Sequence, residues 1–444
     1  LYSDLNTASG HGFSVDNDIL LFDSEGTEAA TIDDNALINA DIFNGLDLSL
    51  VLGGVNSEDV FLKAVAKEIE EELAEKDNQS VLNIINRIPP GINPDLDALL
   101  QRARETIGEE QLNDLLDKTN TTLTQTGATQ EQRNQMQRLG QMLLNRVNNA
   151  SGRSSGNSGV ATGNALAGFK SWAQAFGQYS DQGARNGFRG YDAVTWGIAM
   201  GADRQVDEDL LLGAAFSYAN IGVSVDNNIG RTDINSFQFS LYGSYDITDN
   251  LFISGQTSYA LGHNALRRND AGGSGRTAEA SYFTNQWLVQ SQLGYDFDVT
   301  EGMKVTPMMI NDFAYLRANA YDETGAGGVN LNVGSSDVAS YNIGGGVNYE
   351  WAIALAEDKV LTPNVFLGYT VDLLNQAVSS TAQFQGGGAS FETTGITPDR
   401  NNFLLNAGLL YEAAENIEIR LDYNLVVKDQ FTSQAGALKG SYLF

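Results

Sequence analysis

One short pattern in the sequence matches a catalytic motif. The run Gly152-Arg153-Ser154-Ser155-Gly156 has the spacing of the nucleophile turn of serine hydrolases. That turn requires a strand before the serine and a helix after it. Residues 151–168, however, are rich in Gly, Ser and Asn throughout, as in a flexible linker. We therefore interpret the match as accidental and expect no enzyme activity.

Residues that could bind a metal are also sparse. Asp16-Asn17-Asp18 and Asp23-Ser24-Glu25 could offer oxygen ligands to a calcium ion, but acidic surface turns are the simpler interpretation. The sequence has no cysteine, and its two histidines, His11 and His263, are far apart. We therefore expect no metal site, no cofactor and no histidine-based catalytic site.

The chain is strongly acidic. Its 444 residues include 26 Lys+Arg and 56 Asp+Glu, which gives a formal net charge of -30. Nucleic-acid binding needs a basic surface, so the composition argues against a nucleic-acid partner. No apolar run approaches the ~20 residues of a transmembrane helix, so any membrane crossing must use β-strands.

The N-terminal part of the chain divides into two regions with different patterns. Residues 1–56 carry ten acidic residues and no Lys or Arg, and their short alternating runs indicate the end of a β-rich region. Residues 57–127 have helical spacing instead. We expect a helix capped by Ser57 and running to Leu73, one from Asn93 to Gly108, and one over 109–119.

Residues 128–168 are predicted to form a polar helix followed by the Gly/Ser linker. The helix covers 129–149, and at 1.5 Å per residue it is ~32 Å long, close to the thickness of a bilayer core. It is too polar to face lipid but could stand inside a water-lined pore; the alternative is packing with 57–127 outside. Its notable residues are the apolar Leu139 and Leu143 and the basic Arg133, Arg138 and Arg146.

Residues 169–444 alternate between apolar and small or polar residues, which predicts an all-β region of about twelve antiparallel strands. Five short turns alternate with longer Gly/Asn/Asp-rich connections, at about 181–189, 226–231, 267–277, 321–337, 374–398 and 428–434. This asymmetry is typical of an outer-membrane barrel. The short turns lie near Asp207, Thr248, Glu301, Glu357 and Glu415.

The aromatic residues separate a lipid-facing barrel from a soluble β-sandwich. Outward aromatic residues fall into two rows, roughly 18–28 Å apart at ~3.3 Å per residue, which matches the ~25 Å apolar band of such barrels. A sandwich has no reason to form two level rows. One row consists of Tyr218, Tyr259, Tyr315, Tyr369 and Tyr423, and the other of Tyr245, Tyr295, Tyr349, Trp351, Tyr411 and Tyr442.

The opposite face of these strands is expected to line the lumen. Twelve strands enclose a space for about one helix or a narrow water column. We expect the inward glycines to make room for helix 129–149 and the inward acidic residues to attract its arginines. The candidate lumen residues are Gly197, Gly201, Gly213, Asn348, Glu350, Glu412, Arg420 and Asp422.

Over about 129–444 this arrangement resembles the translocator of type V autotransporters. In that family an N-terminal passenger precedes a pore helix and a twelve-stranded outer-membrane barrel. The matching motifs are Trp172-Ala173-Gln174-Ala175-Phe176-Gly177, Gly190-Tyr191-Asp192, Trp196-Gly197, Gly201-Ala202-Asp203, Leu212-Gly213, Phe216-Ser217-Tyr218, Thr362-Pro363, Gly368-Tyr369 and Phe444.

The resemblance also suggests roles for two pairs of residues. Tyr442 and the terminal Phe444 are similar to the signal that the barrel assembly machinery recognises, although Lys439 replaces a frequent glycine of that signal. Some relatives cleave their passenger between two asparagines inside the pore. Asn148-Asn149 could react in this way beside Glu350, but the surrounding sequence does not match.

The resemblance implies that the chain inserts into the outer membrane of a Gram-negative bacterium and exports or displays its N-terminal region. Residues 1–56 would then be the end of a passenger on the cell surface. The implied partners are outer-membrane lipid, lipopolysaccharide and the barrel assembly machinery. The alternative is a plugged, porin-like barrel without a secretion role.

Overall fold

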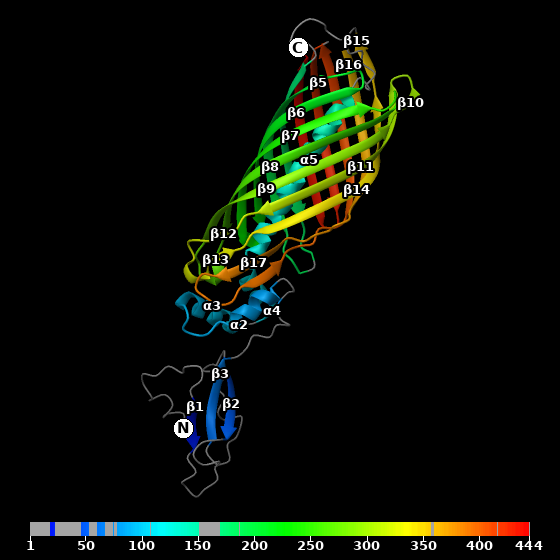
Figure 1. The fold of residues 1–444 in the computed structure, drawn as a ribbon. Helices are drawn as coiled ribbons and strands as arrows, with labels where there is room; N and C mark the ends of the chain where they lie inside the picture. Colours follow the sequence, from blue (N-terminus) through cyan, green and yellow to red (C-terminus); the bar gives the residue numbers. More distant parts are fainter. Residues whose placement is uncertain are drawn as a thin grey trace.

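A closed β-barrel with one helix running through it dominates the computed structural model of the chain (Figure 1). The expected all-β barrel with an internal helix is confirmed. The structure describes residues 18–22, 46–52, 60–66, 74, 78–106, 108–150, 169–185, 187–356, 359–414 and 416–443.

Twelve long antiparallel strands form the wall of the barrel. Each pairs with the next, and the last pairs with the first in an unbroken register from Phe431↔Gln182 to Leu443↔Lys170. The wall therefore closes on itself and leaves no unpaired edge among these strands. They are β4 (Phe169–Gln182), β5 (Tyr191–Gln205), β6 (Leu210–Val225), β7 (Gly230–Asp246), β8 (Leu251–Arg268), β9 (Ala278–Tyr295), β11 (Met303–Ala318), β14 (Ser336–Trp351), β16 (Lys359–Asp372), β19 (Asn401–Ala414), β20 (Ile417–Lys428) and β21 (Phe431–Leu443).

The alternation of side chains along β5 shows why the wall needs lipid. Trp196 and Met200 point outward and are 55% and 50% exposed, whereas Thr195 and Ala199 point inward and are 1% and 5% exposed. The same pattern of exposed apolar residues recurs around the barrel. Water would solvate such a continuous apolar surface poorly, so it indicates a lipid-facing wall.

The two ends of the barrel differ in the length of their connections. Short turns join the strands at one end, where β10 (Phe297–Thr300) and β15 (Ile353–Ala356) extend the wall. Most connections at the other end are longer, but the one expected at 226–231 is short: η2 (Asp226–Asn228) and one further residue join β6 to β7. The expected long connection at 428–434 is wrong: β20 and β21 are joined by a tight turn at Asp429-Gln430, with Gln430 at a φ of 55°.

Two of the long connections fold into a second sheet over the long-loop end. Its strands are β12 (Tyr321–Asp322), β13 (Leu331–Val333), β17 (Ser379–Phe384) and β18 (Phe391–Thr394), in the order β12-β13-β17-β18. Three helices cover this sheet: α2 (Gln79–Asn86), α3 (Pro94–Glu105) and α4 (Glu109–Asp117) (Figure 1). We call these helices together with the loop sheet the cap.

Local sequence explains where the cap helices begin. The side chain of Asn93 accepts a hydrogen bond from the backbone N–H of Asp95 at 2.9 Å, and Pro94 occupies the first turn, as expected. Gly108, however, does not end this helix. The helix ends at Glu105, and Gly108, at a φ of 102°, precedes the first residue of α4.

The helix inside the barrel, α5 (Thr122–Ala150), has 29 residues. It begins seven residues before the predicted start at 129, because threonines and Gly127 have low helix propensity and gave no helical pattern. Its first turns form inside the barrel mouth, where Gly127 approaches the ring of Tyr191. No described helix is long and apolar enough to cross a membrane.

One predicted helix is wrong. Residues 60–66 form β3 (Val60–Ala66), which pairs with β1 (Asp18–Phe22) and β2 (Leu46–Leu52) in a three-stranded sheet. The spacing of Val60, Leu62 and Val65 fitted a helix, but β-branched residues also favour strands, and pairing on both sides decided the outcome.

Candidate functional site

The candidate functional site is the lumen that α5 occupies. The helix enters from the long-loop end and ends near the short turns (Figure 1). It lies against β6, β7 and β8, and more loosely against β9 and β11. On this side Leu143, Leu144 and Val147 pack against Trp172 and Leu211. The helix is therefore held eccentrically, against one part of the wall.

An ion pair fixes the C-terminal end of α5. Arg146 donates two hydrogen bonds to Asp203, at 2.5 and 3.1 Å, and a third to Ser441 Oγ at 3.0 Å. Tyr242 donates its hydroxyl hydrogen to Asp203 at 2.9 Å and accepts one from the Trp172 indole at 2.8 Å. Arg146 and Asp203 are almost completely buried, so the pair is shielded from water.

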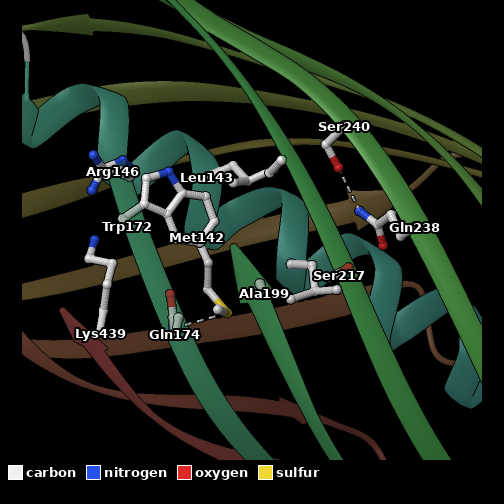
Figure 2. Close-up of a pocket in the computed structure, with 12 residues that line it drawn as sticks. Met142, Leu143, Arg146, Trp172, Gln174, Ala199, Ser217, Gln238, Ser240 and Lys439 are labelled. Carbon is white, nitrogen blue, oxygen red and sulfur yellow. Dashed lines mark hydrogen bonds between the residues drawn. The ribbon is translucent and has the colours of Figure 1, made fainter. Parts of the chain in front are cut away.

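The same arginine lies where the barrel closes. Trp172 belongs to the first strand and Ser441 to the last, and the two are register partners. Arg146 donates a hydrogen bond to Ser441. It also lies over the Trp172 ring, 5.3 Å from the ring centroid; Figure 2 shows these two side chains next to each other. The end of α5 therefore contacts both strands of the closing seam.

The middle of α5 is held by amide groups. Gln137 donates to Asp312 at 2.7 Å, and Gln132 donates to Asn264 at 3.0 Å. Gly140 lies so close to Gln256 and Gln290 that a β-carbon there would lie 2.0 Å from the Gln290 amide oxygen. A side chain at this position would require the ends of these two glutamine side chains to move.

The remaining arginines of α5 lie near acidic residues other than the predicted ones: Arg133 near Asp372 and Asp312 of the wall, and Arg138 near Glu131 of its own helix. Arg138 is half-buried and donates to Ser433 Oγ at 2.8 Å, and Arg133 is only 5% exposed within the lumen. One of the predicted acidic residues is occupied elsewhere: Asp422 accepts from Arg420 of its own strand at 2.8 Å. Two other wall carboxylates bind the helix: Asp203 pairs with Arg146, and Asp312 accepts from Gln137. Neither was among the predicted lumen residues.

The inward glycines make room for aromatic rings rather than for α5 directly. A β-carbon at Gly197 would lie 2.4 Å from the Phe176 ring, one at Gly201 would lie 2.7 Å from the Trp172 ring, and one at Gly213 would lie 2.4 Å from the Tyr242 ring. These rings belong to neighbouring strands, and Trp172 and Tyr242 then pack against the end of α5.

Adding a methyl group at one of these glycines should destabilise the barrel. In Gly201→Ala the new β-carbon would also lie 2.6 Å from the backbone oxygen of Ala214, which cannot move freely. We expect a loss of about 1–3 kcal/mol in the free energy of unfolding, measured by urea titration in detergent. Gly440→Ala is the matched control, because nothing lies within 4 Å of a β-carbon there. Equal urea midpoints for the two variants would contradict the packing argument.

The other predicted lumen residues lie near the short-turn end. Asn348, Glu350 and Arg420 line one small cavity beside Asn148, whose amide donates to Gln292 at 2.8 Å. Glu412 is half-buried on β19. The side chain of Asn149 lies outside the described residues, so the proposed reaction between Asn148 and Asn149 stays a sequence-based hypothesis.

The aromatic residues of both predicted rows lie on the outer face. In the row nearer the long loops, four hydroxyls donate to an amide oxygen of the adjacent strand: Tyr218 to Asn235, Tyr259 to Asn285, Tyr369 to Asn401 and Tyr423 to Gln434, at 2.7, 2.7, 2.6 and 3.1 Å. Tyr315 lies on the same face, half-buried. The other row consists of Tyr245, Tyr295, Tyr349, Trp351, Tyr411 and Tyr442.

Several predicted sites lie partly or wholly outside the described residues. Tyr442 is 43% exposed on the outer face, but Phe444 lies outside the described residues. So do the Gly152–Gly156 match and the candidate calcium ligands, except Asp18, which begins β1.

Sequence reasoning missed most of the residues that contact α5. Asp203, Tyr242 and Ser441 point into the lumen through ordinary strand alternation, and that alternation could have placed them there. It could not show which of the many inward polar residues would contact the helix, because this depends on how far α5 lies from the barrel axis.

Comparison with known proteins assigns the fold. A family model described as Autotransporter beta-domain matches residues 171–424, more than half of the chain. The translocator domain of autotransporter NalP from Neisseria meningitidis has the same fold, with a TM-score of 0.54 at 16% identity, covering 73% of this chain and 99% of that one.

Two curated relatives are Outer membrane protein A of Rickettsia rickettsii and Outer membrane protein B of Rickettsia conorii. The first is 26% identical over 282 residues, covering 61% of this chain and 12% of the relative. The second is 28% identical over 284 residues, covering 60% and 17%. The chain thus spans less than a fifth of either relative. It belongs to the autotransporter β-domain family, and its barrel lies in the outer membrane.

Proposed function

We propose that this chain is a translocator that exports the polypeptide preceding α5 and displays it on the cell surface. One observation carries the proposal: α5 fills the lumen and enters it from the long-loop end, so the chain before Thr122 emerges there. Long connections face outward in outer-membrane barrels, which places the cap outside the cell and the short turns in the periplasm. The proposed role is export and display without catalysis.

Protease digestion of intact cells tests this topology. A glutamate-specific protease should trim an epitope-tagged N-terminal region and leave the barrel whole, because the short turns at Glu301 and Glu357 face the periplasm. The same protease should cut these turns once the outer membrane is permeabilised. Cleavage at Glu301 or Glu357 in intact cells would overturn the proposal.

A porin-like function is the second candidate, and one observation favours it: a cavity of about 130 Å³, lined by both polar and apolar side chains, remains beside α5. Deletion of residues 129–149 separates the two functions. If α5 is a plug, single-channel conductance in planar bilayers should rise several-fold and the cells should become sensitive to large hydrophilic antibiotics. If the full chain already conducts as well as the deletion variant, the porin-like function is the better one.

We also propose the partners of the barrel. The outward position of Tyr442 at the end of β21 supports recognition of Tyr442 and Phe444 by the barrel assembly machinery. The hydrogen-bonded tyrosine row near the long loops would lie at the headgroup level of the outer leaflet, among lipopolysaccharide. Phe444→Ser should lower the amount of heat-modifiable, assembled barrel; an unchanged amount would argue against the signal.

A further inference from the structure

α5 does not fill the lumen. A cavity of about 130 Å³ separates one face of the helix, including Asn134, Gln141 and Asn145, from β14, β16, β19 and β20. A second cavity of about 40 Å³ lies nearer the short turns, and Asn145, Met308, Phe366 and Asn406 line both. We call the two together the side channel. Most of the surface of the larger cavity is apolar, but amide groups of α5 and the wall also line it, so it offers space and hydrogen-bond partners for several water molecules.

At the extracellular end, a loop crosses the barrel mouth and touches α5. Gln130 on the helix donates to the backbone oxygen of Ile396 at 3.2 Å. Gly395 lies so close that a β-carbon there would be 1.9 Å from the Thr126 hydroxyl. Ile396 itself is only 3% exposed. The connection between β18 and β19 therefore lies directly across the path that leads out of the lumen.

The cap helices hold this loop region in place. Leu96 and Leu99 of α3 and Leu116 of α4 are fully buried in one apolar cluster with Phe384 and Phe391 of the loop sheet. The loop sheet has only four short strands, and without the helices its aromatic side chains would face water. The loop sheet and the helices are thus one folded unit. The 395–396 loop is tied to this unit, because the backbone N–H of Gly395 donates to the backbone oxygen of Val378, a member of the cluster, at 2.8 Å.

Polar contacts fasten this unit to the barrel. Arg268, at the end of β8, and Glu323 of the cap form a completely buried ion pair at 2.5 Å. Arg268 also donates to the backbone oxygens of Lys118 and Val329, at 2.6 and 3.0 Å. On α3, the backbone N–H of Gly328 and then the Arg276 guanidinium lower the pKa of Asp95, so this carboxylate stays charged near neutral pH.

We propose that the cap has a function of its own: it seals the side channel at the cell surface. The helix alone leaves the two cavities of the side channel beside it, and the loop at 395–396, tied to the cap, would close the lumen above them. The cap precedes α5 in the chain, so it folds outside only after it has passed through the pore. In this respect the inference rests on the proposed export function.

Conductance of the purified full chain in planar bilayers tests the seal. Leu99→Glu places a carboxylate in the apolar cluster of the cap, far from the contacts of α5 with Asp203. Gln101→Glu is the matched control, because Gln101 is exposed on the same helix. We expect conductance to rise several-fold in Leu99→Glu and to equal the wild type in Gln101→Glu. Trypsin cleavage at Arg102 and Arg104 reports whether the cap has opened.

A second variant keeps the test decisive. If Leu99→Glu leaves the cap resistant to trypsin, deletion of residues 79–117 removes the three helices outright and should give the same rise in conductance. Wild-type conductance in a variant whose cap is open or absent would overturn the seal. Failure of both variants to assemble would also count against it, since a seal formed after export is not needed for assembly. If the N-terminal region of the wild-type chain were not displayed on the cell surface, the export function itself would be refuted.

Discussion

Replacing Arg146 by alanine is expected to release the end of α5. In the wild type Asp203 accepts two hydrogen bonds from Arg146 and one from Tyr242. In the variant it would remain buried with only the hydrogen bond from Tyr242. Removing one member of a buried ion pair costs about 3–5 kcal/mol, which is large relative to the contacts that dock a single helix. We expect a lower urea midpoint in detergent and faster trypsin cleavage within α5 at Arg133 and Arg138.

A second arginine of the same helix is the control. Arg138 is half-buried and donates to the neutral Ser433, so Arg138→Ala should have a clearly smaller effect. The double change Arg146→Met with Asp203→Leu should recover part of the loss, because two apolar residues leave no unpaired charge. If Arg146→Ala kept the wild-type urea midpoint and trypsin resistance, this ion pair would not be what docks the helix.

Replacing Arg268 by alanine is expected to detach the cap from the barrel rim. The change leaves Glu323 buried without its partner and removes the donors to the Lys118 and Val329 oxygens. We expect a loss of about 3–5 kcal/mol in cap stability and rapid trypsin cleavage in α3, while the heat-dependent gel shift of the barrel stays unchanged.

The neighbouring residue provides a matched control for this change. Arg267 forms an ion pair with Glu279 at 3.1 Å, but both side chains are more than half exposed. Arg267→Ala should therefore cost no more than about 1 kcal/mol. Equal trypsin sensitivity of the Arg267→Ala and Arg268→Ala variants would show that burial of the Arg268 pair does not matter for holding the cap.

The sequence alone predicted which part of the chain forms the barrel and which residues of each strand face inward or outward. Strand alternation follows from geometry, since successive side chains point to opposite faces, so inward Gly201 and outward Tyr259 can be assigned without knowing any partner. The existence of a polar helix near 129–149 also followed from local spacing. Its extra turns at Thr122–Ala128 did not, because they are stabilised by burial in the barrel mouth rather than by helix propensity.

Only the tertiary structure decided which residues hold α5 inside the barrel and which hold the cap above it. The ion pairs Arg146–Asp203 and Arg268–Glu323 join residues 57 and 55 positions apart, and no local pattern links them. In the cap, two loops, around Val329 and Phe384, pack against the three helices in one apolar cluster. Such contacts arise from the position of whole elements in space, which depends on packing of the complete chain and not on any short stretch of sequence.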